Sequence, residues 1–214
     1  FYKIIITNYY YDLACPPGCD HRKYFKTSVT YAVLCCRLNF PNGFPEEYSF
    51  MATFRMVKNT VNKVWNIWQV VDEDGRKQAG LRLNGDEQSL EFFLMGMDGQ
   101  LQTVTFPGLS VLFNSKWHKV MVGVERDQVT LYVDCQPVNS KPIKGKDVID
   151  TEGDTLIGRP HTLTWSKPCA VFELQWMLIH CDPKRAQRES CSELPQPEVN
   201  GAILVLFFIH LLCA

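Results

Sequence analysis

Large apolar residues recur at every second position from Tyr48 to Met56, with smaller or polar residues between them. A period of two is typical of a β-strand with one face in a core, so this segment is predicted to be a half-buried strand. Comparable apolar runs predict further strands at Trp65–Val71, Ala79–Leu83, Leu90–Met95, Leu101–Phe106, Trp117–Val124, Val129–Val133, Leu156–Ile157 and Val171–His180. Helical periodicity is almost absent, which favours an all-β fold.

Turn residues separate these apolar runs. The pairs Asp74-Gly75, Asn84-Gly85 and Asp98-Gly99 each stand between two predicted strands. Such pairs are strong signals for a β-hairpin. A further hairpin is predicted around Arg126-Asp127. Many short strands joined by tight turns indicate a β-sandwich or jelly roll.

The end of the strand-rich region has its own pattern. The apolar run Leu174–Ile179 leaves little polar surface for a sheet edge, so the last strand is predicted to pair on both sides within a sheet. After it, Lys184–Ser190 is predicted to form one short helix. Asp182 would be its N-cap, and Pro183 would take its first position.

The chain divides into three zones: an irregular segment at residues 1–43, a strand-rich domain at 44–195, and a polar spacer with an apolar tail at 196–214. The apolar part of the tail, Ala202–Ala214, is shorter than the roughly 20 residues that span a bilayer. It could be a truncated membrane span, or a lipid-anchor signal that begins at the small residues Ser190–Ser192. A chain end outside any folded unit is the preferred interpretation, because the tail is too short to span.

The chain has nine cysteines: Cys15, Cys19, Cys35, Cys36, Cys135, Cys169, Cys181, Cys191 and Cys213. So many cysteines suggest an oxidising compartment, and the odd number leaves at least one thiol free or paired between chains. Zinc is the competing interpretation for Cys15 and Cys19, but no second ligand pair follows them. The pattern therefore favours disulfides in a secreted protein.

The net charge of −1 gives no overall field that would attract nucleic acid or an anionic membrane. Basic residues cluster only locally, in one loop with Lys141, Lys144 and Lys146 and in a final turn with Lys184, Arg185 and Arg188. If the final turn is helical, Lys184 and Arg188 share a face. Both clusters could bind a sulfated polysaccharide, the alternative being ordinary solvated surface. No aromatic residues interleave with these charges, which argues against nucleic-acid binding.

Motifs for catalysis or cofactor binding are absent from the sequence. The five histidines, His21, His118, His161, His180 and His210, have no metal-ligand spacing, and there is no nucleophile elbow, P-loop or dinucleotide fingerprint. Glu91 and Glu173 are the strand-borne glutamates that an enzyme could use as a carboxylate pair, but surface positions explain them better. The acidic group Asp72–Asp74 is better explained as a hairpin turn than as a calcium loop. No cofactor is predicted, and a structural divalent cation stays open.

Several segments resemble the amino-terminal non-collagenous domain of fibril-associated collagens. The resemblance covers about residues 40–195 and lies in Phe44–Phe50, Trp65–Gln69, Leu101–Thr103, Trp117–Lys119, Gly123–Arg126, Val133–Cys135 and Phe172–Pro195. It implies a laminin-G-like, thrombospondin-N-terminal-like jelly-roll sandwich. It also implies a secreted, non-catalytic module of the extracellular matrix. The expected partners are heparan sulfate or another glycosaminoglycan, collagen fibrils, matrix glycoproteins and other collagen chains.

The resemblance further implies a disulfide between Cys135 and Cys191. Cys181 would then need an amino-terminal partner, either Cys15 or Cys19. Before residue 40 the chain diverges from the family, and after Pro195 no Gly-X-Y collagen triplet follows. The alternative function is a membrane- or lipid-anchored adhesion or lectin-like domain.

Overall fold

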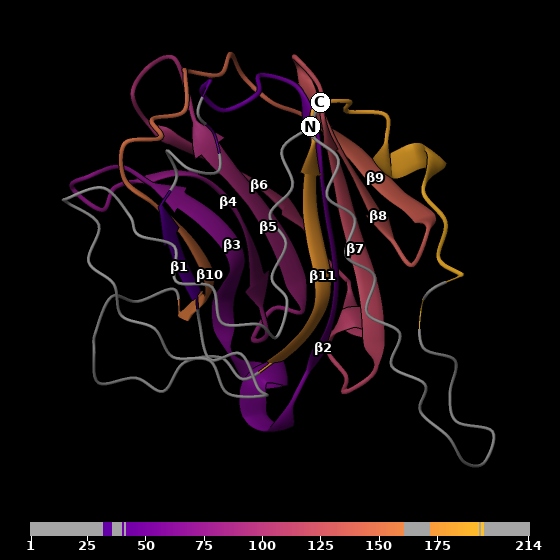
Figure 1. Ribbon diagram of the computed structural model, residues 1–214. Coiled ribbons are helices and arrows are strands. Elements are labelled where there is room, and N and C mark those ends of the chain that lie inside the picture. Colours follow the sequence, from indigo (N-terminus) through magenta and orange to yellow (C-terminus); the bar gives the residue numbers. More distant parts are fainter. Residues whose placement is uncertain (1–31, 36–39, 41, 161–171, 193, 195–214) are drawn as a thin grey trace, which may run out of the picture.

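Two antiparallel β-sheets face each other across a shared apolar core in the computed structural model of this chain (Figure 1). The structure describes residues 32–35, 40, 42–160, 172–192 and 194. The six-stranded sheet has the order β1-β10-β3-β4-β5-β6, and the five-stranded sheet has the order β11-β2-β7-β8-β9. This arrangement is a jelly-roll-like sandwich, so the predicted all-β fold class is confirmed.

The strands are β1 (Ala32–Cys35), β2 (Tyr48–Met56), β3 (Val64–Val71), β4 (Lys77–Asn84), β5 (Ser89–Met95), β6 (Leu101–Phe106), β7 (Trp117–Val124), β8 (Gln128–Val133), β9 (Gln136–Pro142), β10 (Asp154–Pro160) and β11 (Phe172–His180). Helical structure in the described residues is limited to three short 3-10 helices, namely η1 (Lys58–Asn62), η2 (Ser110–Leu112) and η3 (Ala186–Arg188).

The core lies between the inward faces of the two sheets. The alternating apolar positions of β2 are at most 3% exposed, as their period predicts. Phe50 of β2 stacks on Trp68 of β3 with ring centroids 5.2 Å apart. Phe172 of β11 packs against Trp65 of β3 at 4.8 Å. These aromatic pairs join one sheet to the other and stabilise the sandwich beyond simple burial.

Every predicted strand coincides with an observed one, but two strands were missed. The segment β1 lies in the zone predicted to be irregular, yet it pairs with β10 at the edge of the six-stranded sheet. The segment β9 contains Pro137 and Pro142, and most of its side chains are exposed. An exposed polar strand has no apolar alternation, so the sequence pattern could not indicate it.

The predicted hairpins are present, with different turn geometries. Gly75 and Gly99 adopt positive φ angles of 78° and 69°, which glycine tolerates without strain. Gly85 is required for another reason. A Cβ atom at that position would lie 2.5 Å from the carbonyl oxygen of Val61, so only glycine allows this close approach. The positive φ in that loop belongs to Gln88, at 49°.

One prediction about the end of the domain was wrong, and another has no support among the described residues. In the described sheet β11 is an edge strand that pairs only with β2. Its apolar run is explained by packing on both faces, because Met177 and Ile179 point into the main core while the partly buried Trp176 packs against a second apolar cluster. The predicted helix Lys184–Ser190 is reduced to the single turn η3, because Glu189 is already extended, with a ψ of 150°.

Candidate functional site

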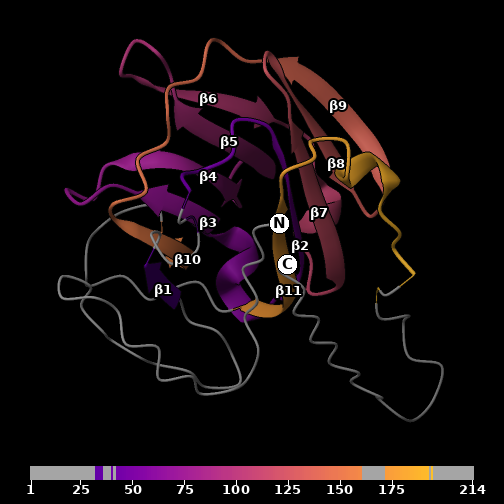
Figure 2. The same cartoon turned by 45° about the horizontal axis from the view of Figure 1, so that its top comes forward.

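The segment that follows β11 crosses the outer face of the five-stranded sheet, and we refer to residues 182–192 as the strap (Figure 2). The Ser49 hydroxyl lies 2.8 Å from the carbonyl oxygens of both Asp182 and Pro183, and it accepts a hydrogen bond from the Ala186 amide at 3.1 Å. A Cβ atom on Gly123 would lie 2.5 Å from the Pro183 carbonyl oxygen. The start of the strap therefore rests directly on the backbones of β2 and β7.

A small apolar cluster lies beneath the strap, separate from the main core. Met51 of β2, Met121 of β7 and Ala186 of η3 form its buried centre. The side chains packed around them are Tyr132, Cys135, Trp176 and Leu178. Because Ser49 and Met51 are covered in this way, β2 is buried on both faces rather than half-buried as predicted.

Lys119 of β7 is a fully buried cation at the end of the strap. Its Nζ atom donates a hydrogen bond to the Ser190 carbonyl oxygen at 2.5 Å and lies 3.5 Å from the Glu189 carboxylate. The ammonium also lies 4.7 Å from the centre of the Trp176 ring, within the range of a cation–π interaction. A buried charge of this kind is tolerated only when partners surround it. The sequence offered no signal for this contact.

A disulfide between Cys135 and Cys191 fixes the strap to the turn between β8 and β9. This is the pairing that the family resemblance implies. Asp134 and Cys135 both have positive φ angles, 50° and 63°, which is the geometry of a type I′ hairpin turn. The Asp134 carboxylate stabilises the turn, accepting a hydrogen bond from the Lys119 amide at 2.8 Å and contacting the His118 ring at 2.8 Å.

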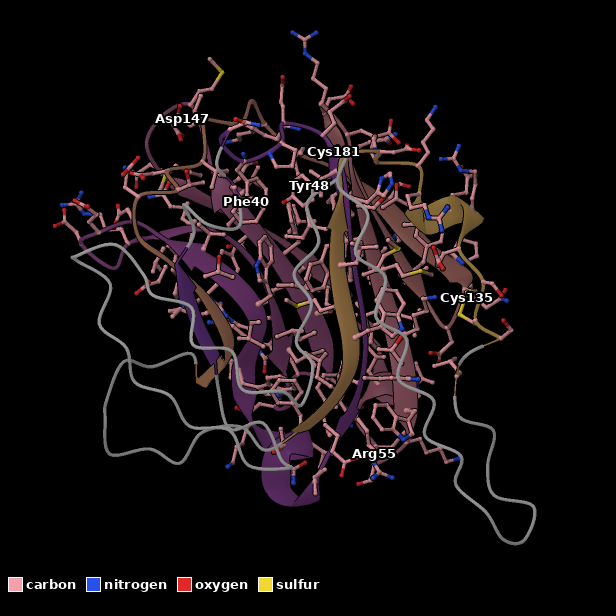
Figure 3. The ribbon with its side chains drawn as sticks, in the orientation of Figure 1. Phe40, Tyr48, Arg55, Cys135, Asp147 and Cys181 are labelled. Carbon is pink, nitrogen blue, oxygen red and sulfur yellow. A yellow bond between two sulfur atoms is a disulfide. The ribbon has the colours of Figure 1, made fainter. Side chains whose placement is uncertain are left out.

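Cys181 and Cys15 complete the predicted disulfide residues. Cys181 is exposed and has no disulfide partner among the described residues, and it lies close to the start of the strap (Figure 3). Cys15 and Cys19 lie outside the described residues, so the predicted link between Cys181 and one of them stays a prediction.

The basic residues of the strap are mostly neutralised within the strap itself. Arg185 forms an ion pair with Glu189 at 3.0 Å, and Arg188 forms one with Asp182. Lys184 is exposed, and no ion pair engages it among the described residues. The helical face that Lys184 and Arg188 were predicted to share does not form, because η3 begins only at Ala186.

The predicted loop cluster divides into three different roles. Lys146 donates hydrogen bonds to the carbonyl oxygens of Glu46 and Glu125 at 2.6 and 2.8 Å, and burial lowers its pKa. Lys141 lies 5.8 Å from the centre of the Phe106 ring. Lys144 is exposed, and only its backbone is engaged, by Gln102. Of these three side chains, Lys144 is therefore the best placed to meet a ligand.

Strand register brings both basic clusters to the same end of the sandwich. In the five-stranded sheet Tyr48 pairs with Val124, Gln128 with Pro142, and His180 with Ser49. The turn at 125–127, the loop at 143–147 and the strap therefore begin side by side. Exposed Arg126 lies in this turn and adds a cation that the sequence clusters did not include. Acidic residues also occur there, so this end has mixed charge.

Two titrating groups lie at the start of the strap. The Nδ1 atom of His180 accepts a hydrogen bond from the Asp182 amide at 3.0 Å. Burial, together with the positive charge of Arg185, lowers the pKa of His180 below its usual value. The Lys184 amide donates to the Asp182 carboxylate at 2.9 Å, and this bond lowers the pKa of Asp182.

The candidate metal and enzyme residues do not converge on a site. No group of acidic, histidine or cysteine side chains in the described residues could hold a metal ion. Asp72 instead accepts hydrogen bonds from the Arg76 amide and the Gln78 side chain within a hairpin turn. Glu91 is paired with Arg82 on the six-stranded sheet, whereas Glu173 is paired with Arg55 on the five-stranded sheet. The two carboxylates therefore lie on different sheets and do not form a catalytic pair.

Nothing in the described part of the chain forms a helix with the length and apolar character needed to cross a bilayer. The apolar tail at 202–214 lies outside the described residues. The anchored alternative that rests on this tail is therefore untested and stays a prediction.

Comparison with known folds supports the sandwich architecture. The structure resembles the receptor binding domain of botulinum neurotoxin C/D mosaic serotype with a TM-score of 0.54 and 12% identity, over 74% of this chain and 39% of that one. A second structure, the HCR/D W1238A mutant, gives a TM-score of 0.51 and 12% identity, over 68% of this chain and 37% of that one. At such low identity the likeness shows the fold alone. No protein-family model matches the chain.

Sequence comparison points to collagens. The chain is 34% identical to the collagen alpha-1(XXI) chain of Xenopus laevis over 167 residues, which is 77% of this chain and 17% of that protein. It is 34% identical to the human alpha-1(XVI) chain, over 72% of this chain and 9% of that protein, and 30% identical to the human alpha-1(XIX) chain, over 76% and 14%. The chain thus spans less than a fifth of the length of these relatives. Its homologues are fibril-associated collagens, consistent with an amino-terminal non-collagenous domain of that family.

Proposed function

We propose that this chain supplies a non-catalytic module of the extracellular matrix to a fibril-associated collagen. The observation that carries the proposal is the 34% identity to collagen chains over about three quarters of the sequence. The disulfide that closes the strap supports it, because such bonds persist in oxidising compartments outside the cell. Collagen fibrils, matrix glycoproteins and other collagen chains are the partners that this role implies.

For the finer function, we propose that the module binds a glycosaminoglycan such as heparan sulfate at the end of the sandwich where the basic clusters meet. Three exposed cations are available to sulfate groups there: Arg126, Lys144 and Lys184. Lys141, Arg185 and Arg188 would contribute less, since each already faces an aromatic ring or a carboxylate. Lys146 holds backbone carbonyls, so its role is structural.

Binding at this end should be weak and sensitive to salt. The net charge of the chain is only −1, and Glu46, Asp127 and Asp182 lie near the available cations. Exposed charges interact over roughly 8 Å at physiological ionic strength. A sulfated chain would therefore respond to a few local cations rather than to the whole molecule.

Heparin-column chromatography in a rising sodium chloride gradient tests this proposal. The double variant Lys144→Ala with Lys184→Ala is expected to elute at lower salt than the parent chain. Lys116→Ala is the matched control, because Lys116 is an exposed lysine just before β7, at the opposite end of that strand. Equal elution of the double variant and the parent, or parent elution at or below physiological salt, would remove the glycosaminoglycan claim and leave the collagen relationship intact.

A further inference from the structure

Edge strands of the two sheets differ in how well their open backbone is protected. Among the described strands, the sheet order leaves β1 and β6 at the edges of one sheet and β9 and β11 at the edges of the other. An edge strand carries backbone amides and carbonyls that can pair with another strand. Proteins usually block such pairing with proline, charged residues or a bulge.

Both edges of the five-stranded sheet have these protections. β9 contains Pro137 and Pro142 as well as Lys141, and the pairing of its neighbour β8 shifts register between Leu131 and Tyr132. β11 carries Glu173 and has a register shift between Leu174 and Trp176. Neither strand offers a regular, uncharged edge to a partner.

β6 has none of these protections in its own sequence or in its pairing with β5, although Lys141 of β9 lies 5.8 Å from the centre of the Phe106 ring. Its sequence, Leu-Gln-Thr-Val-Thr-Phe, contains no charge and no proline. It pairs with β5 without a register shift, from Met95 opposite Leu101 to Leu90 opposite Phe106. Thr103, Val104 and Thr105 are β-branched residues, which favour strand pairing. Apart from the ladder to β5, no described backbone group bonds to the backbone of β6.

The strand is also anchored through Gln102 and is accessible. The Gln102 side chain accepts a hydrogen bond from the Lys144 amide at 2.9 Å and donates to the Lys144 carbonyl at 3.2 Å. Leu101 is 37% exposed, and Thr103 is exposed as well. A preformed strand loses little freedom on binding, so its pairing costs less than that of a flexible segment.

We propose that β6 pairs antiparallel with β6 of a second copy of this chain, joining the two six-stranded sheets into one continuous sheet. A second copy fits this edge because neither β6 strand carries a charged residue, so no like charges of the two strands face each other. A two-fold axis near Val104 would place Thr103 of each copy opposite Thr105 of the other. Both copies would then present the same surface, as a two-fold interface requires.

Sedimentation velocity over a concentration series tests the proposal on the full chain, after any free thiols have been blocked with iodoacetamide. The parent is expected to shift from monomer to dimer as its concentration rises toward about 1 mM. The double variant Thr103→Lys with Thr105→Lys is expected to stay monomeric, because like charges would face each other across the interface. An equimolar mixture with Thr103→Glu, Thr105→Glu is expected to form the dimer again.

A matched control places the same charges on the protected edge. Gln136→Lys with Asn139→Lys changes two exposed residues of β9 and is expected to dimerise like the parent. Recovery in the mixture of lysine and glutamate variants would also show that both are folded. A parent that stays monomeric throughout the series overturns the proposal, as does a lysine variant of β6 that dimerises like the parent. Equal loss of the dimer in the β9 control overturns it too.

Discussion

Lys119 shows how one side chain can hold a whole segment in place. Its stem is buried between β7 and the strap, and its ammonium reaches Ser190, Glu189 and the face of Trp176. In the sequence it follows Trp117-His118 in a strand pattern, where a lysine would ordinarily be solvated. The Lys119 ammonium gains its partners only because the strap folds back onto the outer face of the five-stranded sheet.

Replacing Lys119 with methionine keeps most of the apolar stem and removes the charge. We expect the free energy of unfolding to fall by about 2 kcal/mol, because the Ser190 carbonyl and the Glu189 carboxylate lose a charged donor. Urea titration followed by tryptophan fluorescence measures the change. Lys116→Met is the control for an exposed lysine and should change the unfolding free energy by less than about 0.5 kcal/mol. Equal midpoints for the two variants would contradict this role of Lys119.

The turn at Asp134 and Cys135 has a backbone conformation that its residue types do not predict. Type I′ turns are usually recognised by Asn-Gly or Asp-Gly, because both central residues need a positive φ. Here the second position is Cys135, with a φ of 63°, and the disulfide to Cys191 holds it in place. The disulfide itself could be expected from the family resemblance, whereas the turn could not be read from the residue types.

At the scale of elements, the alternation of apolar residues predicted the strands that border the core. It failed for β9, whose side chains are almost all exposed. It also did not show that the far edge of β11 pairs with no described strand, because packing beneath the strap produces the same apolar run as pairing on both sides. Apolar periodicity indicates that one face of a strand is buried, but it does not identify the neighbouring strand in the sheet.

The strap is a short element that depends on its attachments. Only Ala186–Arg188 is helical, and an isolated turn of this length is not stable in water. The disulfide spans a sequence separation of 56 residues. In the chain-entropy model, closing a loop of that size raises the free energy of the unfolded chain by about 4 kcal/mol and so stabilises the folded state. Ser49 and Lys119 then fix the strap from opposite ends.

Acidification should loosen the start of the strap through His180. Its folded-state pKa lies below the ordinary 6.5, so the unfolded chain takes up the proton first as the pH falls. The stability that neutral His180 contributes is therefore present above pH 6.5 and is lost as the pH falls through the folded-state pKa. Protonation also removes the acceptor for the Asp182 amide.

Thermal melting of the parent and of His180→Asn at pH 7.5 and 5.5 tests this prediction. Asparagine keeps an acceptor for the Asp182 amide and does not titrate. Between pH 7.5 and pH 5.5 the melting temperature of the parent is expected to fall by more than that of the variant. Identical pH dependence in the two proteins would show that His180 does not control the strap.

At the scale of the whole molecule, the sequence located the basic residues but did not show which of their side chains are free to bind a ligand. Lys146, Arg185 and Arg188 looked equivalent to Lys144 and Lys184 in the sequence, yet the fold gives the first three internal partners. The partner Glu46 of Lys146 lies far away in the chain, whereas Glu189 and Asp182 pair with arginines of the same strap. Arg126 was overlooked because it stands alone in the sequence and joins the others only through strand register.

The chain forms a β-sandwich whose strap is joined covalently to the β8–β9 turn. Non-reducing peptide mapping by mass spectrometry, after alkylation of free thiols, tests it most directly. We predict one peptide pair that links Cys135 to Cys191, which only a strap folded back onto the β8–β9 turn can give. Alkylated Cys135 and Cys191, or either residue linked to a different cysteine, would contradict the account.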